Sequence, residues 1–343
     1  MRFDEKLRSP KERALFILSF IFSAVIWLAL IITVFGAIYG VFIAVFILMA
    51  HALFLAQIKG NGLRISEQQI PDLHQRVVEY STRLGLAKAP DVYVLQAGGV
   101  INAFATKFLS RQFVIILSGL VEQCRDPEQL DFVIGHELGH FAAGHLKWKL
   151  FLAPAQIIPL LGAAYSRACE YTCDRIGLFL VGKTEPSMRG LCVLAAGGKL
   201  ALQADLPAFM SQRRDTGGFW MAVLELVSTH PFLCKRAAAL KEYTEPGTVA
   251  PVGRNPLAYP LAPFFGFAAG GSSSALLGIV IAMGILVAIA VPNFKKYLSL
   301  AGASTSRKSL SQPRAPGRPF DSRDGDANAP PEDEDSYDAE KVR

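Results

Sequence analysis

The chain has 343 residues, enough for one good-sized domain or two small ones. Hydrophobic residues make up 51% of it and charged residues only 19%, an apolar bias that points to membrane segments. The formal net charge of +6 is not gathered in one basic stripe, so we expect contact with a membrane surface and no nucleic-acid partner.

The five cysteines lack a CxxC pair, which argues against a disulfide scaffold and favours a reducing compartment. Cys169 and Cys173 lie four residues apart and are interpreted as buried thiols instead of metal ligands.

The N-terminal part of the chain has the composition of a membrane hairpin. After a polar, mostly basic leader, residues 14–58 contain no Asp, Glu, Lys or Arg. A single helix of this length would be more than twice as long as the hydrocarbon core is thick, whereas two spans of about 22 residues fit it. We expect the turn between the two spans near Gly36 and Gly40. Because the leader and Lys59 are basic, we expect both ends of this hairpin, residues 1–58, on the cytoplasmic side.

From residue 59 onward the composition is that of a soluble domain, which we assign to residues 59–247. Periodicity and turn residues predict a helix at 71–84, strands at 92–95 and 113–117 with an extended piece at 100–105 between them, helices at 127–147 and 166–181, and further helical sequence at 188–206 and 219–227. Residues 148–165 are apolar but contain two prolines. We expect them to form a buried or membrane-surface connection, because candidate ligands for one metal ion lie on both sides of them.

The C-terminal part is predicted to leave this domain. Residues 248–274 are rich in proline and glycine and are interpreted as a linker. Residues 275–294 form a third membrane-spanning or membrane-associated helix, and residues 295–343 have the composition of a disordered tail. Part of the third apolar segment, residues 284–294, resembles the membrane helix of type IV pilins. Ala275 stands where the pilin pattern has glutamate, so we interpret the segment as an anchor.

The central motif of the chain is His136-Glu137-Leu138-Gly139-His140. On an α-helix, residues four positions apart project from one face, so both imidazoles can bind one zinc ion. Glu137 would then lie beside the open position of the metal as a general base. Asp126 and Pro127 supply a helix start a few residues upstream. The motif alone is only moderately specific, so a third ligand is needed.

Two residues are candidates for the third ligand. His145 lies nine residues after His136, and on a continuous helix it would point to the opposite side, which favours a structural role. Glu170 lies on the next predicted helix and is the better candidate. Asp174 follows it by one turn and can accept the second ring N–H of a ligating imidazole, which would fix the tautomer of that ring.

Three further stretches accompany the motif: Asn102-Ala103-Phe104-Ala105, Ser166-Arg167 with Glu170 and Asp174, and Thr229-His230-Pro231 followed by Arg236. With them, residues 59–240 resemble the catalytic domain of the membrane-bound zinc metallopeptidases of the HtpX and CAAX-prenyl-endopeptidase type, metallopeptidase family forty-eight, which are gluzincins. The resemblance implies an α+β fold: a mostly helical, zincin-like catalytic domain with a small sheet, plus transmembrane helices. It also implies one Zn²⁺ per chain, held between two helices by His136, His140 and Glu170.

The same resemblance implies roles for the remaining residues. Asn102, Ala103 and Phe104 would belong to an edge strand that pairs with the backbone of a protein or peptide substrate. Glu137 would take a proton from water and return it to the leaving amine. His230 would stabilise the oxyanion, with Arg236 supporting it.

The leading hypothesis is therefore a membrane-anchored zinc endopeptidase that acts on membrane or misfolded proteins. We expect it in a bacterial plasma membrane, with the lipid bilayer as a partner and the catalytic domain on the cytoplasmic side. A second hypothesis is a catalytically silent membrane adaptor that binds peptides, against which the intact Glu137 speaks. A third, a pilus-associated structural protein, rests only on residues 284–294.

Overall fold

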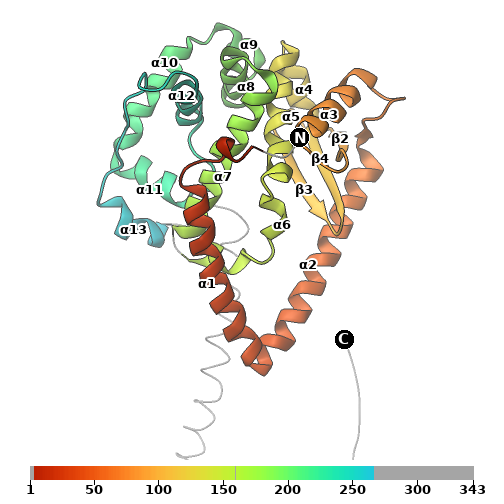
Figure 1. Ribbon diagram of the computed structural model, residues 1–343, viewed down its shortest axis with the longest axis vertical. Coiled ribbons are helices and arrows are strands. Elements are labelled where there is room, and N and C mark those ends of the chain that lie inside the picture. Colours follow the sequence, from red (N-terminus) through yellow and green to blue (C-terminus); the bar gives the residue numbers. More distant parts are fainter. Residues whose placement is uncertain (1–3, 159, 266–343) are drawn as a thin grey trace, which may run out of the picture. The chain divides into compact units, whose positions relative to one another are not determined.

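The structure is a computed structural model that describes residues 4–158 and 160–265 (Figure 1). Its α-helices are α1 (Glu12–Ile32), α2 (Val34–Asn61), α3 (Pro71–Arg83), α4 (Ser118–Gln123), α5 (Pro127–Ala142), α6 (His145–Trp148), α7 (Leu161–Val181), α8 (Thr184–Ala196), α9 (Gly198–Gln203), α10 (Leu206–Ser211), α11 (Phe219–Val227), α12 (Leu233–Thr244) and α13 (Ala258–Phe265). The strands are β1 (Leu63–Arg64), β2 (Asp91–Leu95), β3 (Ala103–Phe108) and β4 (Arg111–Leu117), and the 3-10 helices are η1 (Glu5–Leu7), η2 (Ala153–Ile157) and η3 (Gln212–Gly217). The predicted α+β fold, mostly helical with a small sheet and two apolar helices, is confirmed. The predicted third span and tail lie outside the described residues.

The two apolar helices α1 and α2 follow each other directly. Residues Glu12–Ile32 and Gly40–Asn61 are long and apolar enough to cross a membrane. The turn lies at Thr33, which has extended backbone angles, and not at Gly36 or Gly40 as predicted. Both glycines continue α2, and the role of Gly36 is steric: a Cβ there would collide with the carbonyl oxygen of Leu30 and the hydroxyl of Thr33. The glycine allows α2 to start close to the end of α1.

The sheet has the strand order β1-β2-β4-β3, so β3 is an edge strand, as the resemblance implied. β2 pairs with β4 in parallel, and β3 pairs with β4 as an antiparallel hairpin. Successive side chains of a strand point to opposite faces, and those of β4 separate accordingly. Val114 and Ile116 join the main core, whereas Phe113, Ile115 and Leu117 face Leu55 and Ile58 near the end of α2. The sheet therefore lies between the main core and α2.

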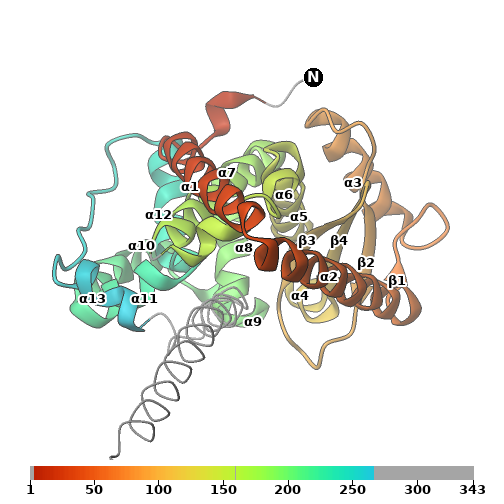
Figure 2. The same cartoon turned by 90° about the horizontal axis from the view of Figure 1, so that it is seen from below.

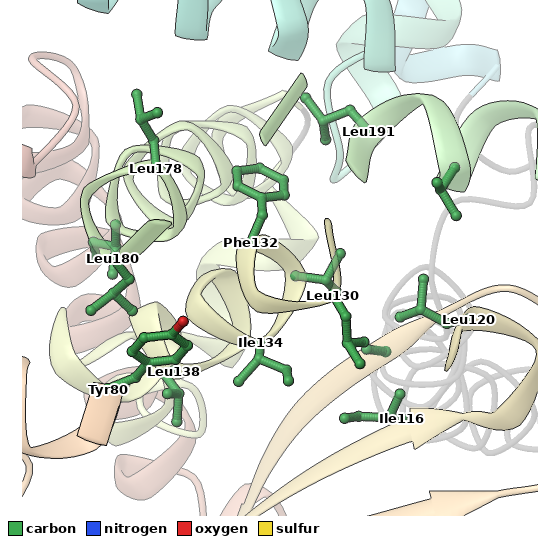
Figure 3. Close-up of a cluster of buried hydrophobic side chains, with 14 of the residues drawn as sticks. Tyr80, Ile116, Leu120, Leu130, Phe132, Ile134, Leu138, Leu178, Leu180 and Leu191 are labelled. Atoms are coloured by element: carbon green, nitrogen blue, oxygen red, sulfur yellow. The ribbon is translucent and has the colours of Figure 1, made fainter. Parts of the chain in front are cut away.

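The main core is built around α5 and α7, which have the most extensive contact of any two elements described. Figure 3 shows Phe132, Ile134 and Leu138 of α5 among core side chains from neighbouring helices and from the sheet. The two helices approach at glycines: a Cβ on Gly135 would come within 3.0 Å of the Gly177 Cα. Farther along, a Cβ on Gly139 would lie 3.2 Å from the Cα of Cys173. Only residues as small as glycine allow the backbones of α5 and α7 to pack this closely.

The first part of the predicted linker is packed against the domain. Ala258 and Ala262 of α13 are completely buried in a small cluster with α11. Before this helix, Arg254 forms a bidentate ion pair with the buried carboxylate of Glu225, at 2.8 and 2.9 Å. The linker was predicted from its proline and glycine content, which reports only on local chain conformation. Long-range contacts such as these two cannot be predicted from it.

Candidate metal centre

Helix α5 carries the central motif in its C-terminal half. Asp126 caps its N-terminus, with Oδ1 accepting a hydrogen bond from the Glu128 N–H at 3.0 Å. The helical spacing puts the rings of His136 and His140 on one face, with their centroids 5.3 Å apart. Helix α7 lies beside this face, and Figure 2 shows α5 and α7 adjacent behind α1 and α2.

The carboxylate of Glu170, on α7, lies between the two histidines. Its Oε2 is 3.3 Å from Nε2 of His136, and its Oε1 is 3.6 Å from Nε2 of His140. Burial raises the pKa of Glu170, but the charges of His136 and Arg236 outweigh this effect and hold it well below its usual range. Oε2 is buried and has no hydrogen-bond partner within the described part of the chain. A buried, ionised carboxylate that faces one imidazole nitrogen with each of its oxygens fits a bound cation.

Cys173 is an alternative donor that sequence analysis set aside. Its Sγ and the ring nitrogens of His136 and His140 all lie within 4.8 Å of one another. However, burial raises the pKa of this thiol well above its usual range, and the thiolate is the form that binds metals. The Sγ also lies 3.6 Å from Nδ1 of His145. Glu170 is therefore the better third donor, and two imidazoles with one carboxylate form a donor set that suits zinc.

Asp174 and Arg236 lie behind His136. Oδ1 of Asp174 is 2.9 Å from Nδ1 of His136, which directs the other ring nitrogen toward Glu170. Arg236 donates to both oxygens of Asp174, at 2.6 and 2.8 Å, and its Nη1 is 3.4 Å from Glu170. The resemblance implied that Arg236 supports His230, but the structure places it against these two carboxylates. A buried guanidinium requires such partners, and α12 brings it to them.

A cavity of about 60 Å³ brings most of the predicted site residues together. Its lining consists of Asn102, Ala103, Phe132, Val133, His136, Glu137, Glu170, Leu194, His230 and Arg236. Burial raises the pKa of Glu137 to about 7, against the opposing charge of His136. This carboxylate therefore sits where a proton can be exchanged near neutral pH.

Phe104 is the predicted substrate-binding residue whose side chain the structure places elsewhere. Its ring stacks on that of Phe54 in α2, with centroids 6.0 Å apart. Its neighbour Ala103 lines the cavity, and side chains alternate between the faces of a strand. The Leu117 N–H donates to the carbonyl of Asn102, and Phe104 lies opposite Ile115, so the backbone groups of Phe104 are directed to β4. The backbone groups of Ala103 and Ala105 are the ones that face the free edge of β3.

His230 lies at the open side of the cavity, with 67% of its side chain exposed. Its Nε2 is 3.4 Å from Oε1 of Glu170. The C-terminal end of α11, which precedes His230, is held by Arg167, whose Nη1 donates to the carbonyls of Glu225, Leu226 and Ser228 at 2.7, 3.0 and 2.7 Å. Sequence analysis gave Arg167 no role of its own. The sequence signal that could have identified Arg167 was its charge, because it lies on a helix that was expected to be buried.

The predicted helix at 127–147 is interrupted, and this changes the place of His145. Helix α5 ends at Ala142, Gly144 has a left-handed φ of 80°, and His145 begins the short helix α6. The prediction that His145 points away on a continuous helix was wrong. Its Nδ1 lies 3.1 Å from Nδ1 of His140, on the side of that ring opposite to Glu170.

Sequence comparisons agree with this arrangement. The profile of peptidase family M48 matches residues 67–153 and 147–244. A plastoglobule-localized metallopeptidase 48 of Arabidopsis thaliana chloroplasts is 30% identical over 183 residues, which cover 48% of this chain and 52% of that protein. A protease HtpX homolog of Methanocaldococcus jannaschii is 31% identical over 127 residues, covering 37% and 42%. A protease HtpX homolog of Bacillus subtilis is 30% identical over 225 residues, covering 53% and 72%. The chain thus spans about half the length of the first two relatives.

Proposed function

The chain belongs to peptidase family M48, and from this premise we propose that it is a membrane-anchored, zinc-dependent endopeptidase. The observation that carries the proposal is that His136 and His140 both face the carboxylate of Glu170, beside a cavity that His136, Glu170 and Glu137 line. Two imidazoles and a carboxylate would hold the metal and leave a fourth position for water or substrate.

Three residues near the proposed metal site would each have a separate role in peptide hydrolysis. A bound zinc ion supplies Lewis acidity, which polarises a peptide carbonyl and makes water acidic near neutral pH. Glu137 takes the proton of the attacking water, and its pKa of about 7 suits both this step and the return of the proton to the leaving amine. His230, exposed at the cavity, would donate a hydrogen bond to the developing oxyanion. Asp174 keeps the proton of His136 on Nδ1.

We propose the edge of β3 as the place where the substrate backbone binds. This strand is at the margin of the sheet, and Asn102 and Ala103 at its start line the same cavity as Glu137. An extended peptide that adds to this edge is recognised through its backbone, so proteins and peptides of many sequences are suitable substrates. Exposed segments of membrane proteins or misfolded proteins fit this requirement.

We further propose that α1 and α2 anchor the enzyme in a bacterial plasma membrane with the metal centre on the cytoplasmic side. Both helices expose large apolar side chains along their length, which a bilayer would cover. The basic leader and Lys59 flank the apolar run and favour the cytoplasmic side for both ends.

The experiment that tests this function compares three forms of the full chain in detergent: wild type, Glu137→Ala and Glu122→Ala. Glu122 is an exposed carboxylate on α4, outside the cavity, and serves as the control. We expect one zinc ion per chain in all three, and cleavage of an unfolded protein by wild type and Glu122→Ala only. Peptide binding without cleavage by the wild type would support the adaptor instead, and a wild type without stoichiometric zinc would refute the metal centre.

A further inference from the structure

A row of buried polar groups connects the first membrane helix to the back of His140. Glu12, the first residue of α1, is only 1% exposed. Its Oε1 lies 3.2 Å from Nε2 of His145, and Nδ1 of His145 lies 3.1 Å from Nδ1 of His140. The other nitrogen of His140, Nε2, faces Glu170. These four side chains come from α1, α5, α6 and α7.

The two Nδ1 atoms of His140 and His145 can form a hydrogen bond only if one of them carries a proton and the other does not. A metal ligand must present a lone pair, so Nε2 of His140 has to be unprotonated and the ring proton has to be on Nδ1. His140 is then the donor, and Nδ1 of His145 must accept. A neutral His145 that accepts at Nδ1 carries its proton on Nε2, directly opposite the Glu12 carboxylate.

The surroundings of Glu12 favour this arrangement of protons. Arg8 and the hydroxyl of Thr172 both bond to the Glu12 carboxylate. The guanidinium of Arg8 balances the negative charge, so a second positive charge on His145 is not needed to keep Glu12 buried. The hydroxyl of Thr172 also accepts a hydrogen bond from the backbone N–H of Ser9 at 2.8 Å, which fixes the residues just before α1 against α7.

We propose that Glu12 and His145 are positioning residues that hold His140 in the tautomer whose Nε2 is free to bind the metal. This inference rests on the proposed zinc centre and adds a membrane helix to it. Glu12 sets the tautomer of His145, and His145 in turn sets that of His140. The arrangement mirrors the one at His136, where Asp174 receives the Nδ1 proton directly.

A second metal ion is the competing interpretation of this cluster. Ligand atoms of Glu12, His145 and Cys169 lie within 4.8 Å of one another. However, Glu12 is already occupied by Arg8, and Nδ1 of His145 faces His140, so a metal would have to displace both contacts. Two zinc ions per wild-type chain, with one lost in Cys169→Ala, would overturn the positioning role.

Two replacements of His145 distinguish the roles of its two ring nitrogens. In His145→Asn the amide oxygen takes the place of Nδ1 and can still accept from His140, whereas in His145→Gln the amide reaches only the place of Nε2. We expect His145→Gln to weaken zinc affinity by about 10- to 100-fold and His145→Asn to keep it within a few-fold of wild type. The measurement is competition between the full chain in detergent and a chelator, with circular dichroism to confirm equal folding. Equal affinities of the two variants would overturn the proposal, whatever their common value.

The role of Glu12 is tested with a matched neighbour. Glu5 also pairs with Arg8, at 2.8 Å, but it is exposed, and Glu12 is the carboxylate that His145 faces. We expect Glu12→Ala to lower zinc affinity and Glu5→Ala to leave it unchanged. Similar affinities of the two variants would refute the role of the membrane helix. Absence of zinc from the wild type would instead refute the proposed function, so the two failures are distinguishable.

Discussion

The separation of α5 and α7 can be tested at Gly177, where the helices are closest. A Cβ at this position would lie 2.7 Å from the carbonyl oxygen of Phe132 and 2.9 Å from one of its ring carbons. Ordinary contacts begin near 3.4 Å, so Gly177→Ala must move the helices apart by about 0.7 Å, because a backbone oxygen cannot rotate away.

The cost follows from this forced movement. Inserting a methyl group into a packed core destabilises a protein by about 1–3 kcal/mol. Replacing a helical glycine by alanine stabilises the folded state by at most about 1 kcal/mol through helix propensity. Since α5 carries His136 and His140 and α7 carries Glu170, the same movement separates the proposed ligands. We therefore expect a lower unfolding temperature and a weaker zinc affinity together.

The control is Gly60→Ala, at a helical position in α2 with no atom within 4 Å of the added methyl group. The unfolding temperature is measured in detergent with and without zinc, and affinity by competition with a chelator. We expect Gly60→Ala to match or slightly exceed the wild type in stability and to bind zinc normally. If Gly177→Ala is as stable as Gly60→Ala and binds zinc as tightly, the glycine contact does not set the metal geometry.

Three further predictions concern the groups around the site. Arg167→Lys cannot reach the carbonyls that the guanidinium joins, so turnover should fall while zinc content stays at the wild-type value; unchanged turnover would contradict this. Arg236→Met leaves the buried carboxylate of Asp174 without its guanidinium partner and should destabilise the fold by roughly 3–5 kcal/mol, and an unfolding temperature equal to wild type would count against the ion pair. Burial raises the pKa of Glu225, but hydrogen bonding to Arg254 outweighs it and lowers the pKa below 4.5. The stability from this pair is therefore complete above pH 4.5 and is lost as the pH falls through the lowered pKa, so unfolding scans of Glu225→Gln should show a flatter pH dependence in this range.

Local sequence patterns were sufficient for the elements that carry the metal centre. The spacing of His136 and His140 determines that both rings share one face of a helix, whatever the helix packs against. Glu170 was identified because it lies on the next helix with Asp174 one turn later. The continuous apolar run at residues 113–117 likewise predicted a buried strand, which is β4.

Contacts between distant parts of the chain were beyond these patterns. A single glycine inside a helical pattern is usually tolerated, so nothing in the sequence showed that Gly144 would adopt a left-handed φ and turn His145 toward His140. Glu12 was counted as part of a polar leader. It is in fact buried, and its partner His145 lies 133 positions later in the sequence. Arg236 was assigned by resemblance, and only the packing of α12 on α7 shows which carboxylate it reaches.

The contacts of α1 also predict where the proposed metal centre lies relative to a bilayer. The charge-free run begins two residues after Glu12, so the apolar core of a membrane crossed by α1 begins within about one helical turn of that residue. Roughly 16–22 Å farther along the same helix, Ser23 accepts from the backbone N–H of Ala155 and Trp27 donates to the carbonyl of Phe151, at 3.1 and 2.8 Å. Such bonds satisfy backbone groups that lipid cannot, so we expect the connection between α6 and α7 to accompany α1 below the membrane surface. Because that connection leads directly into the helix of the third proposed ligand, we expect α1 to hold the proposed metal centre near the membrane boundary.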